Sequence, residues 1–271
     1  ECEGSLYKLA TMNPEEFPEL PKINIENSLE IEQNSLKEMI RKTIFAVSTE
    51  ENRPIFTGCL FEIKNNRLNV VAVDGFRLAW KTKMLQQQVN DFAAVIPGRS
   101  LNEINKIILD SFDTIKIGVA KNQALFEMEN CKIVTRLLDG EFIEYKKLLP
   151  REHNTRIKLN TRSLLDSIER ASLLSQSERN NLIKLSIRDN TMAITSNTEK
   201  GNVYEEVDLE LEGEYLDIAF NSRYLLEGLK NIDSEEIFIE FTTNINPCII
   251  RPADDVKYTY LLLPVRISSN I

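Results

Sequence analysis

The chain has 271 residues, of which 42% are hydrophobic, and its formal net charge is −9. This length suffices for about two domains of ordinary size, and no apolar run approaches the roughly 18 residues of a membrane span. Nonspecific DNA affinity comes from cations that neutralise phosphates, so the acidic balance excludes a protein that coats DNA through its overall charge. Any DNA contact must be local or topological. The first residues carry no secretory pattern, so we expect a cytoplasmic protein without a membrane partner.

The first segment has the pattern of a domain end. A strand-like stretch at residues 5–11 leads into an acidic, Pro-containing loop at residues 13–21, and the chain begins without Met. We therefore expect further sequence upstream.

Two candidate helices open on the pattern of a capping box. Ser35 is followed three residues later by Glu38, and apolar residues at helical spacing predict a helix over residues 35–48. Ser100 and Glu103 form a second such box before a shorter apolar face.

Strand-like segments lie between and after these helices, at residues 58–63, 67–74, 76–82, 114–120, 124–128 and 131–138. Asn65-Asn66 and Lys121-Asn122 are typical of tight turns between antiparallel strands.

The same order recurs after a polar loop at residues 150–155. A helical pattern covers residues 163–174, and an Asp189-Asn190 turn joins two strand-like runs. Residues 220–232 parallel residues 96–108, with Asn221 as the expected N-cap. The offset of about 124 to 128 residues is domain-sized. The sequence therefore predicts an α+β fold made of a duplicated domain, with helices on one face of antiparallel sheets.

Each of the four expected helices carries basic residues on its polar face. A single such face is usually only solvated surface, but four together favour a shared basic surface, although Glu38, Asp166, Glu169 and Glu227 dilute it. The basic residues of these helices are Lys37, Arg41, Lys42, Arg99, Lys106, Arg162, Arg170, Arg223 and Lys230, and Arg53 lies between the first helix and the next strand.

Sequence patterns of catalysis are missing. The single histidine, His153, falls in the polar loop, and no nucleotide-binding, hydrolase or metalloprotease motif occurs. The four cysteines are too widely spaced for a zinc site with that histidine; they are Cys2, Cys59, Cys131 and Cys248. We expect no catalytic residue, no metal and no cofactor.

Two Asp-Gly pairs, Asp74-Gly75 and Asp139-Gly140, are typical of tight turns and by themselves say nothing about function. Each leads into a mixture of large apolar and basic side chains. Residues 260–266 have the same mixture, with Pro264 restricting them to a strand end or edge.

Six segments in this order resemble the bacterial DNA sliding clamp, the beta subunit of the replicative DNA polymerase holoenzyme. They are MNPEEFPELP (12–21), RPIFTGCLFE (53–62), VAVDGFRLA (71–79), LLDGEFIEYKKLLP (137–150), FNSRYLLEGL (220–229) and LLLPVR (261–266). The resemblance covers nearly the whole chain, from about residue 6 to residue 267.

The resemblance implies a non-enzymatic processivity factor. Clamps of this family have three similar domains, and two chains close head to tail into a ring around duplex DNA, with helices lining the hole. The resemblance therefore makes Arg53 and the helical basic residues named above the candidates for facing DNA. Residues 1–26 would be the tail of a missing first domain, residues 27–152 the second domain and residues 153–271 the third. This fragment should be monomeric, because the ring closes between the first domain of one chain and the third of the other.

The resemblance also implies a groove between the second and third domains, into which partners insert a short motif with apolar anchors. These partners would be the replicative polymerase subunit, clamp loader, translesion polymerases, mismatch-repair proteins and ligase. By motif matching, the groove residues are Phe56, Val73, Gly75, Phe76, Arg77, Leu78, Ile143, Lys147, Leu148, Tyr224, Pro247, Leu261, Leu263, Pro264, Val265 and Arg266.

Four groove positions, Phe56, Val73, Phe76 and Ile143, depart from the commonest family residues. All four keep or increase apolar character, so we expect an intact pocket of altered shape. The tail at residues 267–271 extends past the usual family end, towards the groove.

Two alternatives remain at this stage. One is a diverged clamp-fold interaction module without a replication role, which would fail to bind standard partner peptides. The other is an enzyme of unknown type, which only turnover would support.

Overall fold

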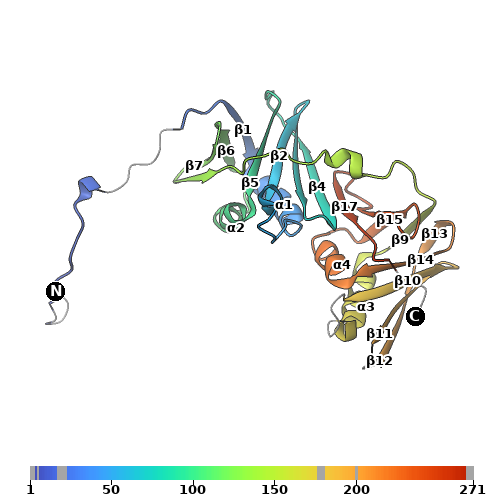
Figure 1. Cartoon of the computed structure of the whole chain (residues 1–271). Helices are drawn as coiled ribbons and strands as arrows, with labels where there is room; N and C mark the ends of the chain where they lie inside the picture. Colours follow the sequence, from blue (N-terminus) through green and yellow to red (C-terminus); the bar gives the residue numbers. More distant parts are fainter. Residues whose placement is uncertain (1–3, 5, 17–22, 176–180, 199–200, 267–271) are drawn as a thin grey trace.

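The computed structural model describes residues 4, 6–16, 23–175, 181–198 and 201–266. Residues 6–12 form no helix or strand, and a single 3-10 turn, η1 (Pro14–Glu16), follows them. In Figure 1 this segment extends away from the rest of the molecule. The expected strand at residues 5–11 is therefore wrong over its described part. A strand needs a neighbour for its backbone groups, and the segment has none among the described residues.

The first half of the folded body contains two α-helices, two 3-10 turns and eight strands. In chain order they are β1 (Asn27–Glu32), α1 (Gln33–Ile44), η2 (Pro54–Thr57), β2 (Gly58–Lys64), β3 (Arg67–Val73), β4 (Arg77–Met84), β5 (Phe92–Pro97), α2 (Gly98–Ile107), β6 (Thr114–Val119), β7 (Gln123–Met128), β8 (Cys131–Arg136) and η3 (Tyr145–Leu148).

The second half repeats this order. Its elements are β9 (Thr155–Asn160), α3 (Thr161–Ser175), β10 (Leu182–Arg188), β11 (Thr191–Thr198), β12 (Gly201–Asp208), β13 (Glu210–Gly213), β14 (Leu216–Asn221), α4 (Ser222–Leu229), β15 (Glu236–Phe241), β16 (Cys248–Pro252) and β17 (Tyr258–Leu262).

Sheet topology confirms the α+β fold and its duplication. The first half has the strand orders β1-β6-β7-β8 and β4-β3-β2-β5, and the second half has β9-β15-β16-β17 and β12-β11-β10-β14. All of these pairings are antiparallel. Strand β13 extends the sheet of the second half by pairing antiparallel with β9.

One sheet crosses from one half to the other. Strand β17 pairs antiparallel with β4, so that Leu261 faces Leu78 and Leu262 faces Arg77. The two sheets merge into a single nine-stranded sheet, β13-β9-β15-β16-β17-β4-β3-β2-β5. The two halves are thus joined by backbone hydrogen bonds as well as by side chains.

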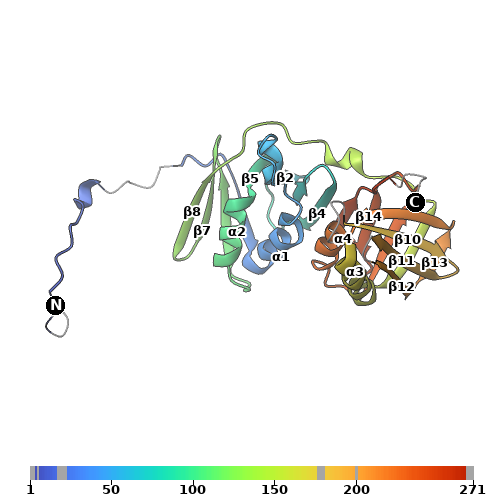
Figure 2. The same cartoon turned by 60° about the horizontal axis from the view of Figure 1, so that its bottom comes forward.

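The four α-helices lie in a row across one face, with the sheets behind them (Figure 2). Apolar stripes on the helices pack on the sheets, and Leu36, Ile40, Leu101, Ile168 and Leu225 are all buried. The helices' polar sides therefore share one surface.

Helix starts differ from two of the predictions. Helix α1 begins at Gln33, and Ser35 lies inside it rather than at its N-cap. The backbone N–H groups of Gln33 and Asn34 are instead bonded to the carbonyls of Asp113 and Ser111. Both capping boxes are wrong, since α2 has Pro97 at its N-cap and no side-chain cap.

The other two helices have side-chain caps. Asn221 accepts a hydrogen bond from the backbone N–H of Arg223 at 3.0 Å, which confirms the predicted cap of α4. Helix α3 begins two residues before the predicted Ser163, and Asn160 accepts from the backbone of that serine at 2.9 Å.

Among the helices of the described chain, none combines the length and hydropathy of a membrane span. The same described residues contain no group of three or more His, Cys, Asp or Glu side chains arranged to hold a metal ion.

Candidate functional site

The Asp74-Gly75 pair forms the turn between β3 and β4, beside the line where the two halves meet. The Asp74 carboxylate accepts hydrogen bonds from the backbone N–H groups of Phe76 and Arg77 at 2.9 and 3.0 Å. Gly75 has φ +94°, a conformation that disfavours any side chain. The carbonyl of Phe76 accepts from the backbone N–H of Leu263 at 2.9 Å. The turn is therefore bonded to the residue that follows β17.

Arg77 fills the centre of this junction and is buried, with 5% of its surface exposed. Its guanidinium donates to Asp74 at 2.9 Å and to the carbonyl of Phe45 at 2.7 Å, and forms a short ion pair with Glu227 of helix α4. It also lies over the Tyr224 ring, 4.5 Å from the centroid. Arg77 was predicted to line the groove, but its guanidinium binds groups inside the junction.

Electrostatics agree with this placement. Burial lowers the pKa of Arg77, but interactions with Tyr260 and with the nearby carboxylates outweigh burial and hold it above its ordinary value. For Glu227, burial raises the pKa, and hydrogen bonds from Arg223 and Arg77 outweigh this and hold it below its ordinary value. Both groups are therefore charged at neutral pH.

A second apolar cluster, separate from the main core, lies beside Arg77 on the sheet face away from the helices. Its buried members are Leu60, Val71, Val73, Leu78, Val95, Tyr145 and Leu261. The segment at residues 137–149, which we call the connector, packs on this cluster through Leu138, Phe142 and Leu149. Ile143 lies just before the 3-10 turn η3 and Leu148 ends it, and the two residues are 39% and 38% exposed.

Two of the unusual groove residues make aromatic contacts. Phe76 stacks on Tyr224 of α4 with a centroid distance of 5.8 Å and an interplanar angle of 22°. Phe56 meets Phe142 edge to face at 5.8 Å. Each substitution towards an aromatic residue therefore has a partner ring nearby.

The predicted groove residues separate into three groups. Val73, Leu78 and Leu261 are buried beneath the junction, and Arg77 is buried within it. The exposed apolar residues around it are Phe76, Ile143, Leu148 and Leu263. Gly75, Lys147 and Arg266 are exposed, whereas Phe56, Tyr224, Pro247, Pro264 and Val265 are partly buried. Residues 267–271, expected near the groove, lie outside the described residues.

Comparison with known proteins decides the family. Residues 30–144 match the family model of the DNA polymerase III beta subunit, central domain, and residues 146–266 match that of its C-terminal domain. The chain belongs to the bacterial beta sliding clamp family. It is 37% identical to the beta sliding clamp of Staphylococcus epidermidis, over 97% of this chain and 70% of that protein.

Solved clamps share the fold of this family member. The crystal structure of the Bacillus subtilis DNA polymerase sliding clamp matches with a TM-score of 0.91 at 38% identity, over 95% of this chain and 69% of that one. The Thermotoga maritima DNA polymerase III beta subunit matches with a TM-score of 0.90 at 28% identity, over 98% and 72%. The chain is thus a sliding clamp of DNA replication, with the central and C-terminal clamp domains.

Most basic residues on the helix face of this clamp are paired with carboxylates. The four acidic residues that dilute this face each bind one of the candidates: Glu38 binds Lys42, Asp166 binds Arg162, Glu169 binds Lys230 and Glu227 binds Arg223, at 2.7 to 2.9 Å. Arg41, Lys106 and Arg170 also form ion pairs, and Lys37 donates to the carbonyl of Ile108. Arg53 and Arg99 are exposed and form no ion pair with the described residues.

Lys42 was predicted to face DNA, but it is buried in the structure. Only 4% of its surface is exposed, and its ammonium lies within 3.6 Å of Glu38, Asp233 and Asp255. Lys81 joins the same cluster through Glu38 and Asp255. The cluster links α1 and β4 to two loops of the C-terminal half, so Lys42 holds the two halves together rather than facing solvent.

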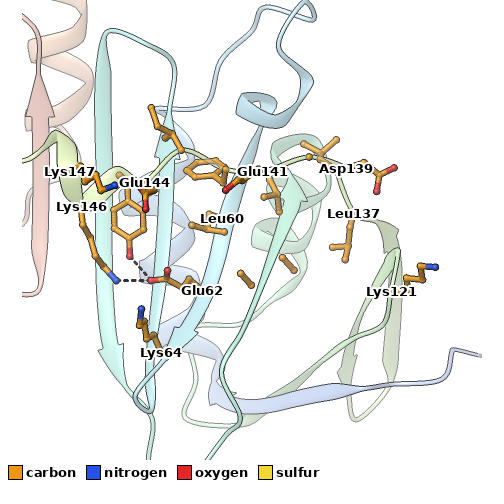
Figure 3. A pocket seen from close by; sticks show the side chains of 18 residues that line it. Leu60, Glu62, Lys64, Lys121, Leu137, Asp139, Glu141, Glu144, Lys146 and Lys147 are labelled. Atoms are coloured by element: carbon orange, nitrogen blue, oxygen red, sulfur yellow. Dashed lines mark hydrogen bonds and ion pairs between the residues drawn. The ribbon is translucent and has the colours of Figure 1, made fainter.

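Sequence reasoning missed the residues that fasten the connector. The carboxylate of Glu62 on β2 accepts from the hydroxyl of Tyr145 at 2.7 Å, from Lys146 at 3.0 Å and from Asn69 at 3.1 Å. Figure 3 shows the first two bonds. Tyr145 also packs edge to face on Trp80. Glu62, Tyr145 and Lys146 lie within two of the segments that resemble the family, but no pattern pairs them, because Tyr145 and Lys146 are 83 and 84 residues from Glu62 in the sequence.

Proposed function

We propose that this clamp tethers replication and repair proteins through a peptide-binding groove at the junction of its two halves. The observation that carries the proposal is the convergence of apolar residues from both halves. Leu261 of the second half pairs with Leu78 of the first, and the backbone N–H of Leu263 donates to the carbonyl of Phe76. Phe76, Leu148 and Leu263 remain exposed, and Leu148 adjoins Leu149, which packs on the cluster that contains Leu78 and Leu261. Exposed apolar side chains beside such a cluster are typical of sites that take the anchors of an extended peptide.

The partners that we propose are those of the family: the replicative polymerase subunit, clamp loader, translesion polymerases, mismatch-repair proteins and ligase. The clamp itself would be non-catalytic and cytoplasmic, without metal or cofactor. We assign residues 27–152 to the second clamp domain, residues 153–271 to the third and residues 1–26 to the tail of a first domain.

For the full-length protein we propose a homodimeric ring around duplex DNA. The β17–β4 pairing supports this, because it joins two repeats by continuing their sheets. By the duplication, β8 corresponds to β17 and β12 to β4, and both are terminal strands of their sheets in the described part of the chain. A third repeat could therefore be added at either end in the same manner. The 271-residue chain by itself is proposed to be a monomer.

The groove is tested by titrating a fluorescent peptide with Leu and Phe anchors into the protein. Leu263 and Leu148 are the residues to change, because both are exposed and their loss leaves no core cavity. Leu263→Asp and Leu148→Asp should each weaken binding about tenfold or more, since a charge replaces an apolar contact. The control is Leu173→Asp at a residue of helix α3 that is 71% exposed, and it should bind like the parent protein.

Equal binding by all of these variants would place the peptide elsewhere. A parent protein that does not bind the peptide would contradict the groove and favour a diverged interaction module.

A further inference from the structure

A cavity of about 600 Å³ lies under the connector, on the side away from the junction. Figure 3 shows it between the connector, strands β2 and β5, and the β6–β7 turn. Leu60 and Val95 form its floor and Leu138 and Phe142 its wall, whereas Lys121 lies on its rim. Neither the family resemblance nor the motif matching assigns this cavity a function.

The cavity continues the apolar surface of the proposed groove. Leu60 and Val95 belong to the same buried cluster as Val73, Leu78 and Leu261. Two further residues, Ile143 and Lys147, line the cavity and were also predicted for the groove. One apolar cluster thus lies beneath the connector, between the opening of the cavity and that of the proposed groove.

The connector is held as a fixed ridge between these two openings. Tyr145 is 3% exposed and donates its hydroxyl hydrogen to Glu62, and burial, followed by this carboxylate, raises the pKa of Tyr145. The backbone N–H of Leu138 donates to the carbonyl of Val95 at 2.9 Å. Both ends of the ridge are therefore fastened to the sheet, and a ligand would pass over the ridge without displacing it.

Strand β5 presents a partly unpaired edge to the cavity. Among the described residues, it is the last strand of the nine-stranded sheet and pairs only with β2. The bond from Leu138 shows that the polar groups of Val95 point away from β2. The polar groups of successive residues point to opposite edges of a strand. The N–H and C=O of Ala93, two residues before Val95, therefore also point away from β2. Within the described part of the chain, the N–H and C=O of Ala93 have no hydrogen-bond partner.

We propose that this cavity is an additional subsite for the partner peptide, and the inference rests on the proposed function. A peptide anchored in the groove would continue over the ridge at Ile143 in extended conformation. Its flanking segment would pair with the edge of β5 at Ala93 and place one apolar side chain against Leu60 and Val95. Strand addition at an open edge supplies backbone bonds, and the pocket supplies selectivity for the side chain. Partners with an apolar flanking residue would therefore bind more tightly.

The test compares three fluorescent peptides by anisotropy. The first carries only the Leu and Phe anchors, and the other two add about six residues of alternating Val and Thr, at the amino or the carboxyl end. Such a segment spans roughly 20 Å when extended. One lengthened peptide should bind about tenfold more tightly than the short one, the effect of one additional buried apolar side chain.

Ala93 is the residue to change, because it lines the cavity and is exposed. Ala93→Trp places a bulky indole ring at the edge of β5 that lines the cavity and should abolish the gain while leaving the affinity for the short peptide within about twofold. Ala93→Pro removes the outward N–H without disturbing the ladder to β2 and should reduce the gain. The matched control, Leu173→Trp, adds the same side chain at an exposed site on helix α3 and should keep the full gain. Binding of the short peptide verifies that each variant is folded.

The inference is overturned if neither lengthened peptide binds more tightly, or if the gain persists in Ala93→Trp. In both cases the short peptide still binds, and the proposed groove stands. If the short peptide fails to bind the parent protein, the groove itself fails, and this subsite fails with it.

Discussion

Single residues at the junction differ in what they contribute, and Arg77 is the clearest case. Its buried guanidinium pairs with Glu227 of the other half, so Arg77→Ala should leave Asp74 and Glu227 without their buried cation and lower the free energy of unfolding by about 3–5 kcal/mol. Arg223 binds the same glutamate from a side chain that is 68% exposed, so Arg223→Ala should cost no more than about 1 kcal/mol. Urea unfolding measures both values, and equal losses would contradict a structural role for Arg77.

Leu78 contributes mainly to stability, although its motif matches the peptide-binding groove. It is 1% exposed, and Leu78→Ala would open a cavity that costs about 2–5 kcal/mol. Leu263 is 37% exposed, so Leu263→Asp should leave the unfolding free energy nearly unchanged while weakening peptide binding. The two variants measured together by urea unfolding and peptide titration separate stability from recognition. A large loss of stability in Leu263→Asp would contradict this division.

Elements were predictable from sequence where their signals are local. The turns at Asn65-Asn66 and Asp189-Asn190 have positive φ at both residues, as the dipeptides indicate. The start of α1 was not predictable, because residues 111–113 supply its N-terminal hydrogen-bond partners. The burial of Lys42 depends likewise on carboxylates from three separate elements. Glu38 is a local i,i+4 partner of Lys42, but spacing along the chain contains no information on the pairs with Asp233 and Asp255.

The charge cluster between α1, β4 and the loops of the C-terminal half should make the junction acid-sensitive. Burial raises the pKa of Asp255, but Lys81 outweighs it, so that the folded pKa lies below the ordinary value. The same direction holds for Glu38 and Asp233. A lowered folded pKa contributes stability above the unfolded pKa, near 4, and that stability is lost as pH falls through the folded value.

Unfolding free energies measured between about pH 3 and pH 7 should therefore decrease below about pH 4. Asp255→Asn should be less stable at pH 7 and should lose less stability on acidification than the parent protein. An identical pH dependence in the variant would show that this cluster is not responsible.

At the scale of the whole molecule, the helices share one face, but most of its cations are neutralised within the protein. The 271-residue chain should therefore bind DNA weakly and with strong salt dependence. Arg99 is exposed without an ion pair among the described residues, and Arg99→Ala should reduce the salt slope by about one. Lys184→Ala, on β10 rather than on a helix, should leave the slope unchanged. Tight, salt-insensitive binding would contradict this account.

The duplication was visible in the sequence because each repeat has its own helix and turn signals. The merged nine-stranded sheet was not visible, because β17 and β4 are far apart in the chain and no local pattern specifies their pairing. The groove therefore came from resemblance, while the division of its residues into buried and exposed groups required the structure.

Hydrogen–deuterium exchange with and without the short anchor peptide tests the central claim most directly. Bound peptide should slow exchange at residues 74–78, 142–149 and 261–266, which surround the junction, and leave β12 and helix α3 unchanged. Protection confined to other segments, or none at a peptide concentration that saturates binding, would contradict a groove between the two halves.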